Sequence, residues 1–426
     1  MSKTLHTRRQ FLRTSLLGGA VSWSIPVFLE RTFFSLDALA ADSALATGKD
    51  SQILVVLQLA GGNDGLNTLV PFADDAYLRA RPTIAIKHPL RLNDALGLHP
   101  KLAGLRGMYD DGQLAIVQGV GYPNPNRSHF RSTEIWQTAS DANKTESRGW
   151  IGRYFDSCCQ GEDPAVGVSI GKQTPQAFAA RDPKGISFAQ PEQFRFASEK
   201  TSDPDAAEEF FRSVNEANDG GSIGMLEGSA PAQGETMDFL RRTALDAQMS
   251  SDKVLAITRK SRSEVPYPAG NLASSLNLVA RLIAGGMPTR IYYVSQGGYD
   301  THSNQKGSHE RLLGELDAAV TAFVGDLKSQ GNLERVALMT FSEFGRRVAE
   351  NGSGGTDHGA AAPLFVLGGG VKPGLYGTSP SLTDLRGGDV IHHVDFRSVY
   401  ASLLKNWLRV PVEPILHREF PTIGFI

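Results

Sequence analysis

The feature that most constrains this sequence is its alternation of short apolar runs with amphipathic helical patterns. Six runs are rich in apolar residues and are expected to form strands: Ile53–Leu59, Leu114–Gln118, Val166–Ile170, Arg290–Ser295, Val336–Phe341 and Pro363–Leu367. Between or after them, apolar residues recur at helical spacing in Ser128–Ala139, Leu272–Ala284, His309–Leu327 and Phe396–Leu408. Continuous rather than alternating apolar runs are typical of parallel strands buried on both faces. We therefore predict an α/β fold with a mostly parallel central sheet and helices on both faces.

The first forty residues have the layout of an export signal. Residues 7–13 read TRRQFLR, an apolar stretch follows from Leu16 to Leu29, and residues 38–40 (ALA) offer a small-residue cleavage site. The arginine pair followed by Phe and Leu resembles the twin-arginine consensus. We therefore predict a signal peptide over residues 1–40, recognition by the twin-arginine translocation machinery, and a periplasmic or secreted mature protein.

The alternative for this segment is a membrane anchor. The apolar stretch contains Pro26 and ends at Glu30, which makes it short and polar for a span of about 20 residues. No later segment approaches that length. We therefore expect no stable membrane span after cleavage.

Charge and composition limit the remaining chain, residues 41–426. The whole chain of 426 residues has a net charge of −2, and residues 1–40 carry five basic and two acidic side chains, so the rest carries −5. Without a basic run it has no means of neutralising a phosphate backbone, and nucleic-acid binding is excluded. We predict a single domain with a polar insertion near residues 198–234, which includes a short helix at Asp205–Val214 and a loop at Asn218–Gly234.

Polar residues follow four of the predicted strands at the point where each one ends. The segments concerned are Gly61–Gly65, Asn126–His129, Gly297–His302, and Ser342–Arg346 with Thr356–Gly359. In open α/β sheets, ligands bind at the carboxyl ends of the strands. Each segment contains Asp, Glu or His, the side chains that bind Zn²⁺ and similar ions. The only two cysteines are adjacent, so a cysteine-ligated zinc site is excluded.

Together these segments resemble the alkaline phosphatase superfamily, which includes the sulfatases, and they imply an alkaline phosphatase-like domain. By that resemblance, Asp64, Asp357 and His358 would bind one metal ion, and Asp300, His302 and a late histidine, His393, would bind another. His392 and Asp395 are alternatives to His393, and only one residue separates Asp300 from His302 where the family usually has several. The implied cofactor is a divalent metal, zinc or manganese, as one or two ions.

The resemblance also implies catalytic roles. Ser128 would be the nucleophile near the N-terminus of a helix, where anions are favoured. Arg127 and Arg131 could hold a phosphate or sulfate through paired hydrogen bonds. Glu343 is interpreted as a further ligand, as an acid–base group, or as the partner of Arg346 in a buried salt bridge. The alternatives to Ser128 are a plain helix cap at that position, or a nucleophile at Ser132 or Thr68, and His129 is either a ligand or a structural residue.

The whole mature chain also resembles a broad bacterial family of twin-arginine-exported proteins whose function is not established, and the segments that carry this resemblance lie between Leu59 and Gly359. Three functions follow as hypotheses. The first is a metal-dependent hydrolase acting on a phosphate or sulfate ester of a small molecule or polymer. The second is a non-catalytic binding protein that keeps the fold and part of the metal site, and the third is phosphomutase-like group transfer.

Overall fold

The computed structural model describes residues 51–159, 163–181, 185–191 and 250–426. The predicted signal peptide (1–40) and the predicted insertion (198–234, with the helix Asp205–Val214) lie outside these residues. Among the helices of the described part, none is both long enough and apolar enough to cross a membrane.

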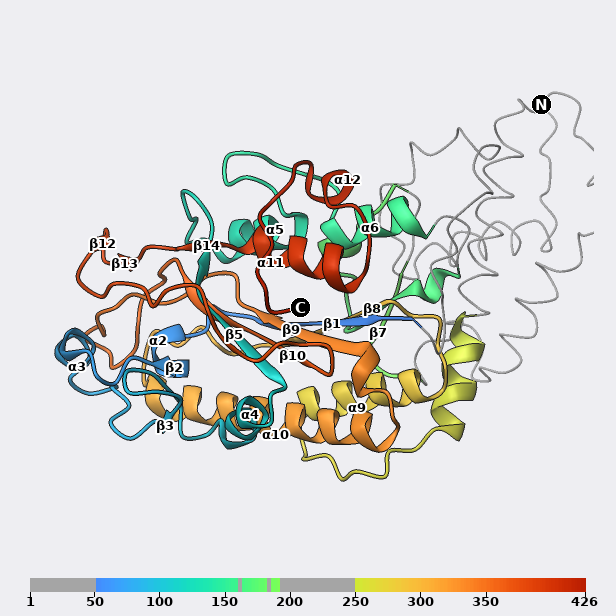
Figure 1. The fold of residues 1–426 in the computed structure, drawn as a ribbon, viewed down its shortest axis with the longest axis horizontal. Helices are drawn as coiled ribbons and strands as arrows, with labels where there is room; N and C mark the ends of the chain where they lie inside the picture. The colour runs from blue at the N-terminus through green and yellow to red at the C-terminus, as the bar shows by residue number, and fades with distance from the viewer. Residues whose placement is uncertain (1–50, 160–162, 182–184, 192–249) are drawn as a thin grey trace, which may run out of the picture.

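A mixed, mostly parallel sheet of nine strands forms the centre of the described chain (Figure 1). Its order is β11 (Gly374–Tyr376), β5 (Leu114–Gly121), β10 (Ala362–Gly368), β9 (Val336–Phe341), β1 (Ile53–Leu59), β8 (Ile291–Gln296), β6 (Gly167–Ile170) and β7 (Ile186–Phe188), with β14 (Val394–Asp395) also paired to β5. Of these strands, only β10 is antiparallel to its neighbours, which are β5 and β9. The prediction of a mostly parallel sheet is confirmed, but the expectation that the run at Pro363–Leu367 is parallel is wrong.

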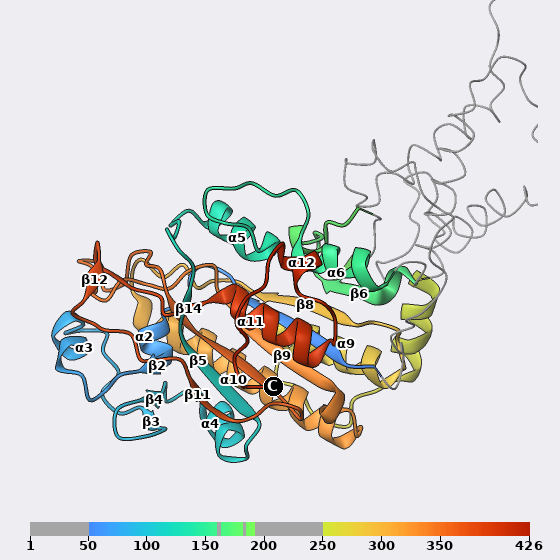
Figure 2. The ribbon, with the colours of Figure 1, turned by 45° about the horizontal axis from the view of Figure 1, so that its top comes forward.

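Helices cover both faces of this sheet, as Figures 1 and 2 show from two directions. One face is covered by α4 (Ala103–Asp110), α9 (Asn271–Ala284) and α10 (Gln305–Ser329). The other is covered by α5 (His129–Thr138), α6 (Trp150–Cys158), α11 (Phe396–Ser402) with its π-helical continuation Leu403–Trp407, and α12 (Glu413–Leu416). The fold is therefore a three-layer α/β arrangement.

Strand β1 shows why the sheet is buried on both faces. Ile53, Val55 and Leu57 belong to the core beneath α9 and α10, whereas Leu54 and Val56 belong to the core beneath α6 and α11. Successive side chains of a strand point to opposite faces, so an apolar residue at every position gives both helical layers something to cover. Each such side chain stabilises the fold by about 1.5–3 kcal/mol on burial.

Small elements surround one edge of the sheet. They comprise the helices α2 (Gly65–Thr68) and α3 (Asp75–Ala80), the sheet of β2 (Leu69–Val70), β4 (Gly97–Leu98) and β3 (Leu90–Arg91), and the hairpin of β12 (Leu385–Arg386) and β13 (Asp389–Val390).

Strand β1 lies between β8 and β9 and is parallel to both. The carboxyl ends of these three strands therefore meet at one edge, and the loops that follow them lie together there.

Candidate metal centre

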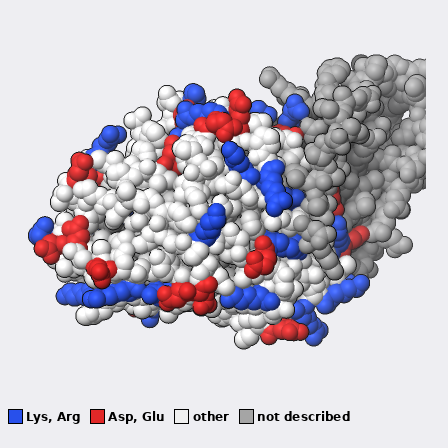
Figure 3. Space-filling view, viewed as in Figure 1, with Lys and Arg blue, Asp and Glu red and all other residues white. Residues whose placement is uncertain are grey.

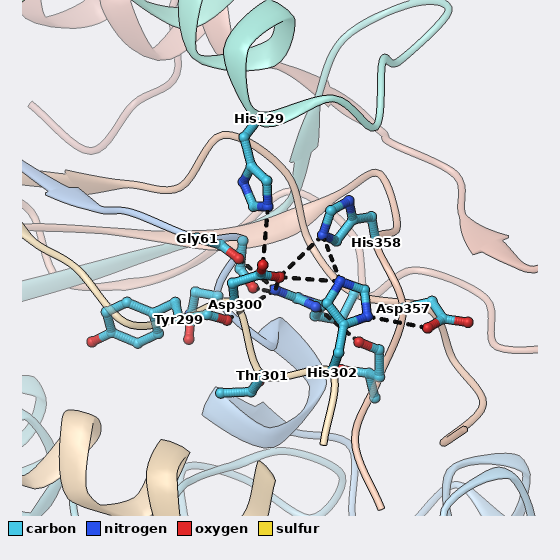
Figure 4. A network of polar contacts seen from close by, with 12 residues as sticks. Gly61, His129, Tyr299, Asp300, Thr301, His302, Asp357 and His358 are labelled. Atoms are coloured by element: carbon cyan, nitrogen blue, oxygen red, sulfur yellow. Dashed lines mark hydrogen bonds and ion pairs between the residues drawn. The ribbon is translucent and has the colours of Figure 1, made fainter. Parts of the chain in front are cut away.

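Three histidines converge on the carboxylate of Asp300 at this edge (Figure 4). Nε2 of His302 and Nε2 of His358 each lie 3.1 Å from Asp300 Oδ1, and Nε2 of His129 lies 3.5 Å from Asp300 Oδ2. The two nitrogens of His302 and His358 are 2.9 Å apart. Ligand atoms of His129, Asp300 and His358 all lie within 4.8 Å of one another, close enough to bind a single ion.

The four side chains come from separate parts of the chain. Asp300 and His302 follow β8, His358 belongs to the long loop after β9, and His129 is the first residue of α5. In Figure 4, His129 points down from α5 toward Asp300, opposite the loop that contributes His302. The site therefore depends on the packing of α5 over the strand ends as well as on the sheet.

Each imidazole has its other nitrogen held by an acceptor outside the cluster. Nδ1 of His129 is 2.8 Å from Glu343 Oε1, Nδ1 of His302 is 3.2 Å from Asp357 Oδ1, and Nδ1 of His358 is 2.8 Å from the Arg127 carbonyl oxygen. Carboxylate and carbonyl oxygens only accept hydrogen bonds, so each ring donates from Nδ1 in the tautomer that leaves Nε2 free to bind a metal ion. In that tautomer the lone pairs of the three Nε2 atoms face Asp300.

This arrangement fits a divalent metal ion. In this tautomer three lone pairs and a carboxylate converge with no proton between them, so they repel one another unless a cation lies among them. Nε2 of His129 is buried and has no hydrogen-bond partner. Histidines that donate their second nitrogen to a carboxylate or backbone carbonyl are the usual form of metal ligands. Asp300 and His302 remain 48% and 44% exposed, so one side of the group faces solvent, as in catalytic rather than structural sites.

Arg346 holds the carboxylate of Asp300 in place. Its guanidinium is buried and donates to the carbonyls of Gly62 (2.7 Å), Thr356 (2.8 Å) and Tyr299 (3.0 Å), to that of Gly61, and to Asp300 Oδ1 (2.8 Å). It thereby joins the loops after β1, β8 and β9.

The charge of Arg346 also sets the ionisation of Asp300. Burial opposes ionisation, but the hydrogen bond and charge of Arg346, together with the neighbouring imidazoles of His358 and His302, outweigh it and hold the pKa of the Asp300 carboxyl at about 2. Asp300 is therefore an anion over the whole physiological range.

Glycine at position 61 allows the loops to approach this closely. Gly61 has a φ of +121°, and a Cβ atom there would lie 2.5 Å from the backbone nitrogen of Asp300. Its N–H donates to Glu343 Oε1 (2.8 Å), the same oxygen that accepts from His129. A side chain at this position would displace both Asp300 and the carboxylate that orients His129.

The structure brings together five residues predicted from the sequence: Asp300, His302, Glu343, Asp357 and His358. Asp357 and Glu343 contact the histidines from outside the cluster. Hydrogen bonds from Asn351 and His302 lower the pKa of Asp357 against the opposing effect of burial, so this carboxylate also stays ionised. Glu343 does not pair with Arg346, whose carboxylate partner is Asp300.

Asp64 lies apart from this group. Its side chain is fully buried, forms an ion pair with Arg81 (2.6 Å), caps α2 and accepts a hydrogen bond from Gln305. Burial raises its pKa, but Arg81 and the hydrogen bonds give a net lowering. All of these contacts are with groups other than the histidines.

The predicted late ligands also lie elsewhere. The backbone N–H of His393 donates to the Gly119 carbonyl (2.9 Å), and Asp395 caps α11 and pairs with Arg397 (2.7 Å). Within the described residues, no contact links these two residues or His392 to the cluster. The only histidines brought to Asp300 in the described part are His129, His302 and His358.

The predicted catalytic residues around α5 divide into two groups. Ser128 is exposed, precedes His129 and makes no capping hydrogen bond, while Arg127 reaches Asp389 (2.8 Å from its Nε). Arg131 instead pairs with Glu134 (2.7 Å) and donates to carbonyls in the loop 141–144. Its guanidinium is thus directed away from the centre.

Sequence reasoning left His129 undecided and missed Arg81, Arg347 and Asp389. The signal for His129 was its place beside Ser128 at a predicted strand end. Arg347 adjoins the Ser342–Arg346 segment and Asp389 follows Gly387 and Gly388, which were available signals, whereas no pattern in the sequence marks Arg81.

Solved structures with a similar fold belong to the alkaline phosphatase and sulfatase superfamily. A protein of the alkaline phosphatase superfamily from Vibrio parahaemolyticus is 8% identical over 96% of this chain and 79% of its own, with a TM-score of 0.38. The PsFucS1 sulfatase from Pseudoalteromonas sp. is 11% identical over 88% and 71%, with a TM-score of 0.36. The periplasmic domain of EcEptC from Escherichia coli, in complex with Zn, is 9% identical over 75% and 73%, with a TM-score of 0.33. Likenesses this distant do not determine the chemistry of the site.

At the level of sequence, no curated protein matches the chain. A family model does match, over residues 51–406, and its description is "Protein of unknown function (DUF1501)". These residues include every member of the histidine cluster and all strands of the central sheet, and the chain therefore belongs to this family.

Proposed function

We propose that the chain is a metal-dependent hydrolase that acts on a phosphate or sulfate ester, with His129, His302, His358 and Asp300 as the ligands of a divalent ion. The observation that supports this most directly is the orientation of the three imidazoles. Glu343, Asp357 and the Arg127 carbonyl each accept from an Nδ1 atom, so all three Nε2 atoms face one carboxylate.

A zinc or manganese ion bound there would act as a Lewis acid and lower the pKa of water at the site. The protein's own groups prepare the site for this role. Arg346 keeps Asp300 ionised and in place. Glu343 and Asp357 fix the rings of His129 and His302, which would otherwise rotate about their side-chain bonds.

Ser128 is the proposed nucleophile. It lies at the N-cap of α5, a ten-residue helix whose first free N–H groups favour an anionic ester. Its hydroxyl makes no capping bond, its side chain is exposed, and the next residue is His129. A hydroxyl in this position can meet the same substrate group as the metal centre.

The proposal also includes export of the protein from the cytoplasm. The twin-arginine pattern at residues 7–13 indicates that the protein acts in the periplasm or outside the cell. Replacing both Arg8 and Arg9 by Lys is expected to leave the protein in the cytoplasm, which cell fractionation measures. Equal export of this variant would overturn the assignment.

The test of the activity combines metal content with ester hydrolysis. The purified full chain is analysed by plasma mass spectrometry and assayed with 4-nitrophenyl phosphate and 4-nitrophenyl sulfate. We expect about one divalent ion per chain, its loss in His302→Ala and His358→Ala, and its retention in the control His393→Ala. Hydrolysis should fall with the metal and also in Ser128→Ala, which keeps the metal. A well-folded protein that binds no zinc or manganese would overturn the proposal and favour a non-catalytic binding protein.

A further inference from the structure

Two arginines beside the metal centre share one buried carboxylate. Nε of Arg127 lies 2.8 Å from Asp389 Oδ2, and Nε of Arg347 lies 3.7 Å from Asp389 Oδ1. The Asp389 side chain is only 5% exposed, whereas those of Arg127 and Arg347 are 39% and 37% exposed. We call Arg127 and Arg347 the arginine pair.

The main chain of each arginine is tied to the metal centre. The Arg127 carbonyl accepts from Nδ1 of His358 (2.8 Å), and the Arg347 N–H donates to the Asp357 carbonyl (3.0 Å). The arginine pair therefore lies directly beside the centre, and these backbone hydrogen bonds fix its position relative to the histidines. In contrast, the side chain that contacts Asp300 is that of Arg346.

The turn between β12 and β13 is shaped to receive both guanidiniums. Gly387 and Gly388 have φ values of +62° and +88°, and Cβ atoms there would lie 3.7 Å from the Arg127 guanidinium and 3.8 Å from that of Arg347. Asp389 follows this turn directly. The glycines thus leave the guanidiniums room beside the hairpin backbone.

The arginine pair has charge and hydrogen-bonding capacity that Asp389 does not satisfy. Two positive charges face one carboxylate, and burial raises the pKa of Asp389 despite both arginines. Nε of Arg347 and Oδ1 of Asp389 are buried without a hydrogen-bond partner. On the face shown in Figure 3, both basic and acidic side chains occur across the surface. An anion would therefore be attracted to the Asp389 region by the arginine pair itself.

We propose that Arg127 and Arg347, positioned by Asp389, form an anion-binding subsite that recognises a second sulfate or phosphate group of the substrate, next to the ester that is hydrolysed. Planar guanidiniums present paired donors that match tetrahedral oxyanions. The side chains turn toward the β12–β13 hairpin rather than Asp300, so they meet a neighbouring group rather than the reacting one. This inference rests on the proposed hydrolase function and narrows its substrate class to esters with at least two anionic groups.

The first test measures anion binding without catalysis. Thermal melting of the full chain is followed against inorganic sulfate and, separately, inorganic phosphate, with a chelator present to remove the contribution of the metal. We expect stabilisation of the wild type at anion concentrations about tenfold lower than for Arg347→Gln. The control Arg386→Gln removes an exposed charge from the same hairpin and should behave as the wild type. Equal anion responses in all three proteins would overturn the subsite, and the stronger of the two anions identifies the group.

The second test measures substrate preference in the metal-loaded full chain. Aryl esters carrying one or two sulfate groups, and one or two phosphate groups, are compared by kcat/KM. Arg347→Gln should lose about tenfold of the preference for the doubly charged ester, mainly through KM, and Arg347→Lys should recover part of it. An equal loss on both esters would overturn the inference, since it would place the arginine on the reacting group. Loss of anion binding in Arg347→Gln with no ester hydrolysed by the wild type would keep the subsite and reject the hydrolase.

Discussion

Nε2 of His302 and Nε2 of His358 lie 2.9 Å apart, and both lie 3.1 Å from the same carboxylate oxygen of Asp300. Because their Nδ1 atoms donate to Asp357 and to the Arg127 carbonyl, neither ring has a second proton to place between them unless it is positively charged. A cation is the simplest group that makes this geometry stable. The relationship is therefore the strongest structural reason to expect a metal ion.

The carboxylates outside the cluster should tune metal affinity without being ligands. Glu343→Gln removes the charge that holds Nδ1–H of His129, and Asp357→Asn does the same for His302. Each change is expected to weaken zinc binding by about 10–100-fold. Competition with a chromophoric chelator measures this. Glu350→Gln is the matched control, because Glu350 contacts Thr83 and Ile84 instead. Unchanged affinity in both variants would mean that the rings are oriented by other groups.

Asp64 should prove structural, in contrast to the ligand role that the sequence predicts. Its carboxylate and the Arg81 guanidinium are both fully buried and 2.6 Å apart. Asp64→Asn leaves Arg81 charged and unpaired, so the free energy of unfolding should fall by about 3–5 kcal/mol. Urea denaturation measures the fall, and metal analysis of the folded variant should still find the ion. Loss of metal with unchanged stability would instead support the sequence-based assignment.

The sequence predicts the central strands well because a strand that is buried on both faces consists of consecutive apolar residues, which can be recognised locally. The expected bounds of Ile53–Leu59 and Val336–Phe341 agree with those of the structure. The direction of the strand at Ala362–Gly368 was not predictable in the same way. Its apolar composition shows that it is buried, but its antiparallel pairing depends on how the long loop after Phe341 returns to the sheet.

The site is predictable only in part, since its residues act through pairings between distant segments. The glycine-flanked position of Asp300 and His302 is visible in the sequence. The pairing of Asp64 with Arg81 is not, because nothing around Arg81 distinguishes it from a surface arginine. Likewise, the approach of His129 to Asp300 depends on where α5 packs, and no local pattern specifies that position.

Arg346 should matter for both stability and metal binding. Arg346→Met removes five hydrogen bonds that join the loops after β1, β8 and β9, and it leaves Asp300 without its charged partner. We expect a loss of about 3–5 kcal/mol in the free energy of unfolding. Arg346→Lys keeps the charge but loses the fork of donors, so it should restore only part of the stability. Equal stability of the Met and Lys variants would show that the charge near Asp300 contributes little.

A pair of buried histidines should make stability depend on pH. Burial is the main cause that lowers the pKa of His309 and of His99 from 6.5 to about 4, against the opposing effect of acidic neighbours. Their rings lie 6.1 Å apart, and His309 Nε2 donates to Asn63 Oδ1 (2.8 Å). Between pH 6.5 and 4 the unfolded chain binds protons that the folded chain does not. Stability from these two groups is therefore complete above pH 6.5, falls as the pH decreases toward 4, and then levels off.

The variant His309→Gln isolates this effect. Glutamine keeps a donor for Asn63 but cannot be protonated in this range. Lowering the pH from 7 to 5 should therefore destabilise the wild type by about 2 kcal/mol more than the variant. Urea denaturation at the two pH values gives this difference, and carboxylates that titrate in both proteins cancel. The same pH dependence in both proteins would contradict the prediction, because it would mean that His309 has the same proton affinity in the folded and unfolded states.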